Sequence, residues 1–565
     1  MNATISLREN VLIIESDFGL RDAIKALPGA RWNPSIVAWT RPATPSAAAE
    51  TAEALANGGA TAVELAPGVN TLAWLYHHAR GALDAPAVTT PPSSPLWNHQ
   101  QRGVDFCHYL IGGENVSGGA MLAWEMGVGK TFAALTFLLD HKFQRILVVC
   151  PKAVVPVWPE QIAKHVPGKI HAAGLVKGSV SKRTGQAEHH ATLAKALGLP
   201  VLLAVNYEAV WRQPMADWVL GQHWDLVIAD EIHRIKAPGG KASKYMAQLG
   251  RYCNHRLGLT GTPMPHSPLD LYAQLRFLDP SIFGTSFTRF RARYAVLQDI
   301  GPHGGKRVLD YQNLDELRQR FARITHLVRS DDVLDLPEQR DVNIPVHLGT
   351  EAATLYADLE RDFVAEIEAG EITLTNALTR LLRLQQITSG HIRTDDGVLA
   401  DVGTAKYDVL RETIGDLPRE PVVVVCRFKP DLAATMAAAA EDERQYRELS
   451  GRINELDDWK SLAARGAGPV LGVQIQSGKE GIDLTAARFA IFYSLGFSLG
   501  DYQQMRKRLH RPGQERVTTY FHLVARGTVD EKVYRALEQR LQVVEYVLAE
   551  MRGGEQTAGG NASQP

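Results

Sequence analysis

The stretch at residues 122–131, which reads L-A-W-E-M-G-V-G-K-T, constrains the fold more than any other part of this chain. The apolar residues 118–123 are typical of a short buried strand, and the residues after Thr131 are compatible with a helix. Glycine is needed between them because a β-carbon would block close approach of the backbone to a phosphate. The free N–H groups and the dipole at the start of a helix favour anions. The stretch therefore predicts a phosphate-binding loop between a strand and a helix.

The side chains of this loop suit a nucleotide with Mg²⁺. Lys130 can reach the β- and γ-phosphates, and the Thr131 hydroxyl can ligate Mg²⁺. Trp124 stands where the usual pattern has its first glycine, so an incidental glycine turn is the alternative interpretation. The loop is therefore predicted to bind the cofactors ATP and Mg²⁺. Besides Lys130 and Thr131, the loop residues predicted to bind them are Met126, Gly127 and Gly129.

Composition sets broad limits on the class of protein. The 565 residues are enough for about three or four domains, and 45% hydrophobic with 22% charged residues is typical of a globular protein. The net charge of −1 neither requires nor excludes nucleic acid, so any such surface must come from local clustering. The four cysteines lie far apart with no C-x-x-C pair, which predicts neither a disulfide framework nor a zinc site.

No apolar run approaches the roughly 20 residues that cross a membrane, and residues 1–15 contain no apolar signal core. We therefore expect a cytoplasmic or nucleoid-associated monomer with no membrane partner.

The first 65 residues predict a small α+β domain, in which Trp32 and Trp39 would supply the large aromatic side chains that a small core needs. Its expected elements are strands at residues 5–14 and 36–40 and helices at residues 20–27 and 47–55. Residues 66–95 predict a helix followed by a proline-rich linker from residue 84.

Residues 96–279 alternate strand, loop and helix, which predicts an α/β lobe with a parallel sheet. Its strand candidates are continuously apolar, as expected for strands covered on both faces, and lie at residues 146–150, 201–205, 226–229 and 256–259.

Two carboxylates directly follow the third of these strands. Ligands bind at the carboxyl ends of parallel strands, where Asp230 can hold Mg²⁺ and Glu231 can polarise the attacking water. The alternative is an exposed Asp-Glu pair without function. We therefore predict Lys130, Asp230 and Glu231 as catalytic residues and Thr131 and Asp230 as the metal ligands.

Residues 404–548 predict a second α/β lobe, and residues 280–403 a helical region between the lobes with a long helical run at 350–387. The strand candidates of the second lobe lie at residues 422–426, 470–473, 489–493 and 519–524. The glycine-rich tail, residues 549–565, is predicted to be disordered.

Residues 504–514 of the second lobe are basic and include Arg508 and Arg511, which the family resemblance given below makes candidate catalytic arginines. An arginine held across a cleft from the γ-phosphate neutralises charge in the transition state and raises the rate by ~10³ or more. Their spacing of three predicts that both share one helical face. A plain basic helix is the alternative.

Several stretches together resemble the Swi/Snf-type branch of superfamily-two helicases. In the first lobe they are the phosphate loop, L-W-N-H-Q-Q-R-G-V (96–104), C-P-K-A-V-V-P-V-W (150–158), W-D-L-V-I-A-D-E-I-H-R-I-K (224–236), L-T-G-T-P (259–263) and L-R-F-L-D-P (275–280). In the second lobe S-G-K-E-G-I-D-L-T-A-A (477–487) resembles the fifth motif of the family, and Q-M-R-K-R-L-H-R-P-G-Q (504–514) the sixth. The resemblance implies two RecA-like parallel-sheet lobes that form a helicase core.

The same resemblance implies roles for individual residues. Gln100 would read the adenine edge, and residues 260–262 would couple the nucleotide state to DNA. Near the DNA backbone we expect Pro151, Lys152 and Arg383, although a solvated helix face is an equal alternative for Arg383. The remaining cofactor-binding residues would be Gly481, Asp483 and Gln504, and Asp483 departs from the more common asparagine of the fifth motif.

Residues 26–40, A-L-P-G-A-R-W-N-P-S-I-V-A-W-T, resemble the HARP module of annealing helicases. The signature of that module pairs Pro-Gly-x-Arg-Trp with a second tryptophan before Thr-x-Pro. If residues 1–65 bind branched DNA, then a tryptophan, or a basic residue such as Arg31 or Arg41, should face solvent. The alternative is that both tryptophans only pack the domain.

The sequence thus predicts an ATP-dependent translocase or remodeller of duplex or branched DNA, with DNA-stimulated ATP hydrolysis. Its fold class is α/β, with two RecA-like lobes and a small N-terminal α+β domain. Annealing or fork remodelling is the finer hypothesis. The alternatives are a nucleic-acid-binding scaffold with a vestigial ATPase and a polymerase-recycling or protein-displacing factor, and the sequence identifies no protein partner.

Overall fold

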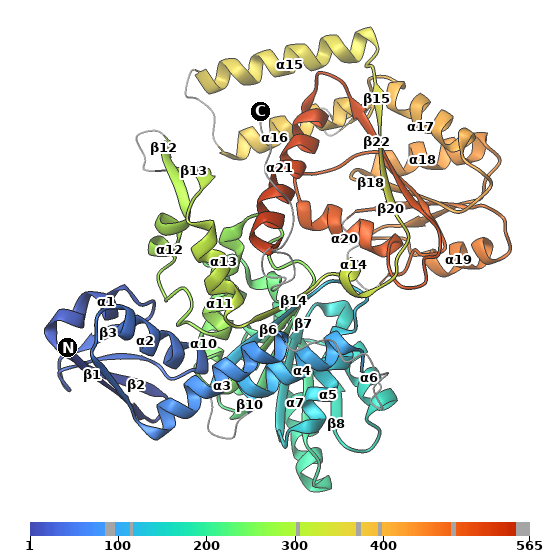
Figure 1. Ribbon diagram of the computed structural model, residues 1–565. Coiled ribbons are helices and arrows are strands. Elements are labelled where there is room, and N and C mark those ends of the chain that lie inside the picture. Colours follow the sequence, from blue (N-terminus) through green and yellow to red (C-terminus); the bar gives the residue numbers. More distant parts are fainter. Residues whose placement is uncertain are drawn as a thin grey trace. The chain divides into compact units, whose positions relative to one another are not determined.

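The computed structural model describes residues 1–84, 96–112, 117–300, 305–368, 374–393, 398–475 and 482–549. The chain divides into two units (Figure 1), the first comprising Met1–Val333 with the end of the chain from Val543, and the second Leu334–Gln542. None of the helices described is long and apolar enough to cross a membrane.

The N-terminal domain is a five-stranded sheet in the order β3-β4-β2-β1-β5, accompanied by two α-helices. The predicted α+β class is confirmed. The predicted strand at residues 5–14 is wrong, because Glu9, with a φ of 52°, and Asn10 turn the chain and give two antiparallel strands. The elements are β1 (Asn2–Arg8), β2 (Val11–Ser16), α1 (Arg21–Ala26), β3 (Arg31–Asn33), β4 (Ala38–Pro42), α2 (Pro45–Asn57) and β5 (Ala62–Leu65).

The first lobe contains a seven-stranded sheet, in the order β14-β6-β11-β10-β7-β9-β8, in which every pairing is parallel. The four predicted strands are confirmed. The strands are β6 (Gly118–Trp124), β7 (Arg145–Cys150), β8 (His171–Gly174), β9 (Val201–Asn206), β10 (Trp224–Asp230), β11 (Cys253–Thr260) and β14 (Thr325–Val328). The helices are α3 (Pro67–Asp84), α4 (Asn98–Ile111), α5 (Lys130–Asp140), α6 (Val157–His165), α7 (Val180–Leu197), α8 (Tyr207–Val210), α9 (Met215–Leu220), α10 (Lys241–Leu249) and α11 (Leu271–Leu278).

The region at residues 280–403 is less helical than predicted. β14 joins the first sheet, β15 joins the second, and β12 pairs with β13 in an antiparallel hairpin. The long helical run is two helices, α15 and α16, and residues 369–373 between them lie outside the described residues. The elements are α12 (Phe287–Tyr294), β12 (Ala295–Ile300), β13 (Gly305–Tyr311), α13 (Leu314–Ala322), α14 (Ser330–Val333), β15 (Gln339–Val346), α15 (Thr350–Glu368), α16 (Leu374–Thr388), β16 (His391–Arg393) and β17 (Leu399–Asp401).

The second unit is built on a six-stranded sheet in the order β15-β22-β21-β18-β20-β19, again with parallel pairings throughout. Its four predicted strands are confirmed, and the residues of the predicted disordered tail beyond Ala549 lie outside the described residues. The elements are α17 (Ala405–Asp416), β18 (Val422–Cys426), α18 (Lys429–Glu441), β19 (Tyr446–Leu449), α19 (Leu456–Ala464), β20 (Val470–Gln474), β21 (Phe489–Phe492), α20 (Leu499–Leu509), β22 (Thr518–Ala525) and α21 (Val529–Ala549).

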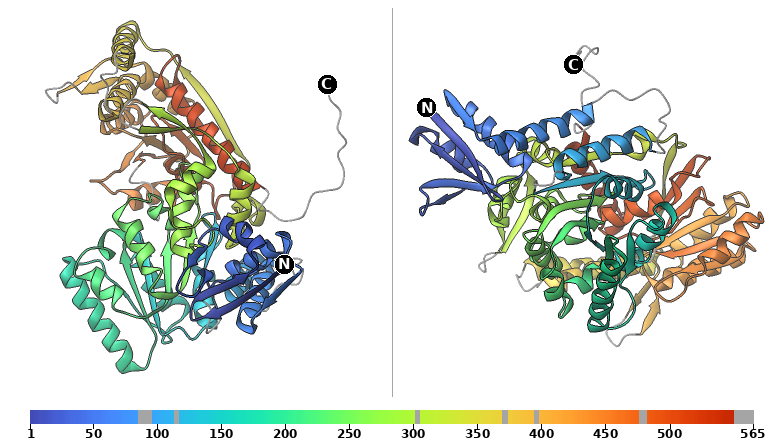
Figure 2. Two further views of the ribbon diagram at one scale, coloured as in Figure 1. Left: turned by 90° about the vertical axis from the view of Figure 1, so that its left-hand side faces the viewer. Right: turned by 90° about the horizontal axis from the view of Figure 1, so that it is seen from below.

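The N-terminal domain, at the blue end of the colour scale, belongs to the same unit as the first lobe (Figure 2). A buried ionic network fastens it to the segment that follows α11 and to α13. Arg41 is only 1% exposed, forms an ion pair with Glu50 and donates to the Ser281 carbonyl at 3.2 Å. Glu50 also pairs with Arg320 of α13 at 2.7 Å. Burial alone would raise the pKa of Glu50, but the surrounding arginines lower it below its ordinary value. Of the residues expected to face solvent, Arg41 does not, because it is buried against Glu50, whereas Trp32 and Arg31 are exposed.

Candidate active site

The phosphate-binding loop has the conformation that its glycines predict. Gly127 and Gly129 have φ values of 87° and 85°, in the left-handed region that favours glycine. A β-carbon at Gly129 would lie 2.1 Å from the Nε2 atom of Gln100. α5 begins at Lys130, directly after this turn. The N-terminus of α5 therefore lies directly at the loop, which is the arrangement that a phosphate-binding site requires.

Lys130 lies inside the loop. Its Nζ atom donates to the backbone carbonyls of Trp124 at 2.8 Å and Glu125 at 3.0 Å. These acceptors are neutral, so they orient the ammonium without cancelling its charge. The side chain is therefore positioned to exchange a carbonyl acceptor for a phosphate oxygen.

Trp124 replaces the usual first glycine without entering the loop. It is the last residue of β6, its side chain is buried, and its Nε1 donates to Nδ1 of His326 at 3.1 Å. A β-carbon at Gly103 would lie 2.1 Å from the indole ring, so the glycine on α4 makes room for the ring. Trp124 thus packs between α4 and β14, and the departure from the usual pattern is a packing feature of this lobe.

Asp230 is buried at the end of β10. Its Oδ2 accepts a hydrogen bond from Trp158 Nε1 at 3.0 Å, and its Oδ1 accepts one from the backbone N–H of Glu231 at 3.0 Å. Burial, with the neighbouring Glu231 charge, raises the pKa of Asp230 to about 6. A carboxylate that is costly to ionise in isolation is a good ligand for a cation, because the cation offsets that cost. Trp158 was not foreseen as its partner, although it ends the C-P-K-A-V-V-P-V-W stretch.

Glu231 adopts a backbone conformation that is rare for a side-chain-bearing residue. Its φ is 52°, in the left-handed region, at a cost of roughly 1–3 kcal/mol. Its Oε2 lies 3.3 Å from Nδ1 of His233, and that nitrogen is 3.0 Å from the Thr260 hydroxyl oxygen. The same hydroxyl accepts from the backbone N–H of Thr262 at 3.1 Å. His233 Nδ1 therefore lies close both to Glu231 at the end of β10 and to the Thr260 hydroxyl at the end of β11.

The phosphate loop also touches this segment. A β-carbon added at Gly261 would lie 3.5 Å from Cγ of Met126, which places Met126 beside residues 260–262. The structure thus brings the loop, the two carboxylates and the L-T-G-T-P segment together at the carboxyl ends of adjacent strands.

Gln100 packs against the loop. Its Oε1 accepts from the Trp97 backbone N–H at 3.0 Å, and its Nε2 donates to the Val128 carbonyl at 3.1 Å. Nε2 of His99 is 2.9 Å from the same carbonyl, and burial lowers the pKa of His99, which keeps the ring neutral. α4 therefore braces the loop through two side chains. No sequence pattern pointed to His99, and the adenine-reading role of Gln100 stays a prediction.

Thr131 is the second residue of α5 and is half-buried. Among the described residues there is no group of three or more His, Cys, Asp or Glu side chains that could hold a metal ion. Thr131 and Asp230 fit Mg²⁺ in the way that phosphate-transferring sites use it, with few protein ligands and the remainder from phosphate oxygens and water.

In the second unit, the fifth and sixth motifs are joined by hydrogen bonds. The Leu484 N–H donates to the Arg508 carbonyl at 3.0 Å, and Nε2 of Gln514 donates to the Ala487 carbonyl at 2.8 Å. Burial would raise the pKa of Asp483, but hydrogen bonds from Thr485 and the charge of Arg511 lower it. Asp483 is therefore held as a carboxylate near Arg511.

The prediction that Arg508 and Arg511 share one helical face is wrong. α20 ends at Leu509, and His510 is extended. Pro512 disfavours helical geometry at the residue before it, so Arg511 lies beyond the helix. Gln504 is half-buried on α20, whereas Gly481 lies outside the described residues.

The three residues expected near DNA occupy different places. Pro151 directly follows β7 and is buried, and the next residue, Lys152, is exposed at the carboxyl end of the first sheet. Arg383 is half-buried on α16 of the second unit. Their contacts with DNA stay predictions.

Comparison with known families identifies two domains in this chain. The SNF2-related domain matches residues 70–391, more than half of the chain, and the helicase conserved C-terminal domain matches residues 405–513. The chain belongs to the SNF2-related family. As a member of this helicase-like ATPase family it is an enzyme, and membership implies that it uses ATP. The HARP-like assignment of residues 26–40 receives no support from these two matches.

Individual relatives are distant. "Putative protein p41" of Acyrthosiphon pisum secondary endosymbiont phage 1 is 26% identical over 76% of this chain and 94% of its own length. The human "DNA annealing helicase and endonuclease ZRANB3" is 24% identical over 76% of this chain, and this match spans only 38% of that protein. The Caenorhabditis elegans homolog of "SWI/SNF-related matrix-associated actin-dependent regulator of chromatin subfamily A-like protein 1" is 24% identical over 93% of this chain and 72% of its own length.

Proposed function

We propose that this SNF2-related enzyme hydrolyses ATP with Mg²⁺ under stimulation by DNA and uses the cycle to move along or remodel duplex DNA. The observation that carries the proposal is the position of His233, whose Nδ1 lies 3.3 Å from Glu231 and 3.0 Å from the Thr260 hydroxyl, beside a buried Asp230. Because His233 contacts both the carboxylate that activates water and the loop at residues 260–262, a change at the bound nucleotide can be transmitted to that loop.

Each residue has a distinct task in this proposal. Lys130 binds the β- and γ-phosphates, and Thr131 and Asp230 hold Mg²⁺, which neutralises phosphate charge when bound. Glu231 orients the attacking water and receives its proton. Gln100, Asp483 and Gln504 are the further residues that we propose to contact the nucleotide.

The second unit supplies the arginines of the proposed reaction. Arg508 or Arg511 stabilises the charge that develops on the transferring phosphoryl group. The hydrogen bonds between the fifth and sixth motifs support a shared task, because they fix the segment after Ile482 against the end of α20.

The test is the steady-state ATPase rate of the full chain without nucleic acid and with single-stranded, duplex, forked and RNA substrates. We expect duplex or forked DNA to raise the rate, and EDTA or the Lys130→Ala substitution to abolish it. An ATPase rate that is the same with and without every DNA would refute the proposal. A Lys130→Ala chain that fails to fold would instead show that the lysine has a structural role.

Annealing or fork remodelling is a second candidate, favoured by the N-terminal domain. The C. elegans match leaves only 7% of this chain uncovered, so it includes part of residues 1–65, and the human relative is named an annealing helicase. Trp32 is 49% exposed and Arg31 is exposed, which meets the expectation for a reader of branched DNA.

Deleting residues 1–65 would be a poor test of this candidate. The deletion would remove Thr44, which donates to Asp279 at 2.7 Å, and Glu50, which pairs with Arg320. Point substitutions are cleaner. We expect Arg31→Ala to reduce the preference for forked over linear DNA while ATPase activity on linear duplex stays unchanged. An unaltered preference for forked DNA would count against the hypothesis that residues 1–65 recognise branched DNA.

A further inference from the structure

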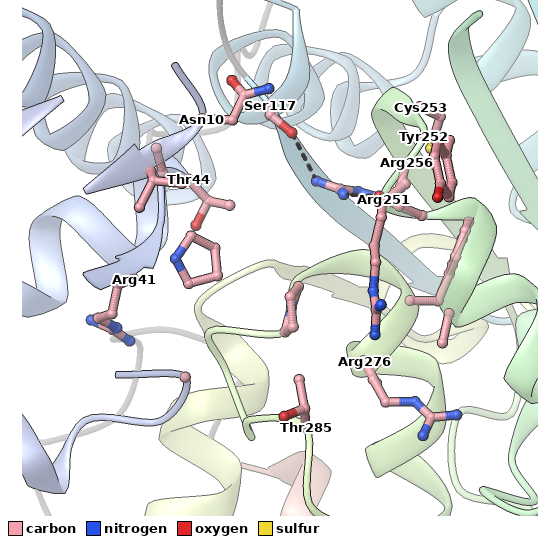
Figure 3. A pocket seen from close by; sticks show the side chains of 18 of the residues that line it. Asn10, Arg41, Thr44, Ser117, Arg251, Tyr252, Cys253, Arg256, Arg276 and Thr285 are labelled. Carbon is pink, nitrogen blue, oxygen red and sulfur yellow. Dashed lines mark hydrogen bonds between the residues drawn. The ribbon is translucent and has the colours of Figure 1, made fainter. Parts of the chain in front are cut away.

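A cavity of about 650 Å³ lies between the N-terminal sheet and the amino end of the first parallel sheet. Its walls come from β2 and β4 on one side and from the start of β11 and the end of α10 on the other (Figure 3). Both walls belong to the first unit, and the ionic network around Arg41 and Glu50 holds them together. The volume is within the ordinary range for small-ligand sites.

The lining of this cavity is strongly basic. Five arginines line it, and its described lining contains no aspartate or glutamate: the arginines are Arg31, Arg41, Arg251, Arg256 and Arg276. Glu50 compensates the charge of Arg41. The other four guanidinium groups leave an excess of positive charge that favours an anion.

Arg256 is buried, and its hydrogen-bond partners carry no charge. It is 6% exposed, and it donates to the Gly118 carbonyl at 3.2 Å, the Gly250 carbonyl at 2.5 Å and the Ser117 hydroxyl at 3.4 Å. All three acceptors are neutral, so the buried charge has hydrogen bonds without an opposing charge. Desolvating a cation in this way is costly, and a bound anion would offset the cost.

The rim of the cavity adds groups that suit an unpaired base. Tyr252 is 55% exposed and adjoins Arg251, which is also exposed and reaches into the space between the two walls (Figure 3). Across the cavity, Asn10 offers an amide and Arg31 a second exposed guanidinium, which donates to the Thr285 hydroxyl at 3.1 Å. Arginine with an exposed aromatic ring is the combination that binds single-stranded nucleic acid, because every base has a face that can stack.

We propose that this cavity binds a single-stranded segment of nucleic acid. Arg31 and Arg251 contact its phosphates, Arg256 adds a buried positive field, and an unpaired base stacks on Tyr252. The inference deepens the proposed function and rests on it, because it supplies a site for the unpaired part of a tailed or forked substrate. Base-paired DNA cannot use the stacking contact, so the site discriminates strand ends from plain duplex.

The site is separate from the nucleotide site in the same lobe. Ser117 precedes β6, and Cys253 begins β11, whereas the phosphate loop follows the other end of β6 and Thr260 is the last residue of β11. A strand of this length spans roughly 20 Å at about 3.3 Å per residue. Nucleic acid in the cavity and ATP at the loop therefore do not compete for the same atoms.

The test measures binding of the full chain, without nucleotide, to a labelled blunt duplex and to the same duplex with a single-stranded tail. We expect Arg251→Ala with Tyr252→Ala to weaken binding of the tailed duplex about tenfold and to leave the blunt duplex unchanged. Loss of one phosphate contact should also reduce the slope of log affinity against log salt by ~0.7. Both residues are exposed, so the fold should survive. Lys195→Ala, at the exposed end of α7, is the matched control and should change neither affinity.

Three results would overturn the site: equal weakening on both DNAs, no weakening on either, or a wild-type chain that binds tailed and blunt duplex equally. A competition arm with inorganic phosphate and with a free nucleoside monophosphate separates the possible sources of the anion. Small anions that bind wild type and not Arg251→Ala, with tail binding unaffected, would assign the cavity to a free anion instead. If tail binding depends on Arg251 while DNA fails to stimulate ATP hydrolysis, the motor proposal fails and the site stands.

Discussion

The two ends of the first parallel sheet carry opposite chemistry. At the carboxyl end, Asp230 and Glu231 lie with the phosphate loop, and the buried carboxyl of Asp230 has a pKa raised to about 6. At the amino end, Arg251 and Arg256 line a cavity whose described lining has no carboxylate. One end suits a metal ion with a nucleotide, and the other suits an anionic chain.

The two ends also differ in how the chain assembles them. The loop at residues 122–131 and the pair Asp230-Glu231 are short contiguous stretches, each following a single strand. The cavity at the amino end combines Asn10 and Arg31 with residues beyond position 250, and it exists because the N-terminal domain covers that edge. A site made by parallel topology is local in sequence, whereas a site made by domain packing is dispersed.

The largest effect is expected at the carboxyl end. Glu231→Gln preserves the size of the side chain and removes the base, so ATP turnover should fall by about 10⁴-fold with ATP binding retained. Steady-state and single-turnover ATPase assays measure it. Glu160→Gln, on an exposed residue of α6, is the control and should leave turnover unchanged. Unchanged ATP turnover in the Glu231→Gln chain would mean that Glu231 is not the base, whereas full biological activity of the chain without ATP turnover would favour a scaffold with a vestigial ATPase.

The next prediction tests whether the residues at the carboxyl end of the first sheet are sufficient for ATP turnover without an arginine from the second unit. Arg511 follows α20 in the second unit, and its Nη1 lies 3.5 Å from the Ile482 carbonyl. Arg511→Ala should lower turnover by about 10³-fold, because charge on the transferring phosphoryl group loses its partner. Nucleotide-free DNA affinity should change little, and Arg516→Ala, on an exposed ion pair with Glu420, should alter neither. If DNA affinity fell as much as turnover, the basic-helix interpretation would be correct.

Periodicity and contiguous motifs were sufficient to predict both parallel sheets, the phosphate loop and its Asp230-Glu231 partner. A run of apolar residues between turn signals has few alternatives when helices flank it on both sides. The loop glycines are required locally, as the φ values of Gly127 and Gly129 show. These features depend on neighbours in sequence.

Features that depend on distant partners could not be predicted. Trp158 became the hydrogen-bond donor to Asp230, and β14 joined β6, only through tertiary packing. The hairpin within residues 5–14 was missed because Glu9 and Asn10 carry neither glycine nor proline as a turn signal. Pro512 did offer a local reason to end α20 before Arg511, and that signal could have been used.

The third prediction separates two arginines that line the same cavity. Arg41→Ala leaves Glu50 with less compensation and removes hydrogen bonds to the Pro28 and Ser281 carbonyls. Breaking a buried ion pair costs about 3 kcal/mol, so amides of α2 should exchange hydrogen ~100-fold faster. Arg31→Ala, on the exposed side of the cavity, should leave exchange unchanged. Similar exchange in the two variants would mean that the buried network does not hold the N-terminal domain in place.

The smallest effect is expected at Trp32, which lies on the opposite face of β3 from Arg31 because successive strand residues alternate. Its ring meets Trp39 edge to face, with ring centroids 5.7 Å apart. Trp32→Ala should therefore cost about 1 kcal/mol, measured as roughly fivefold faster amide exchange in β4. If the cavity is the nucleic-acid site, this substitution should leave the affinity for tailed duplex unchanged. A loss of tail binding in Trp32→Ala, with none in Arg251→Ala, would move the nucleic-acid site to the tryptophan face of the same sheet.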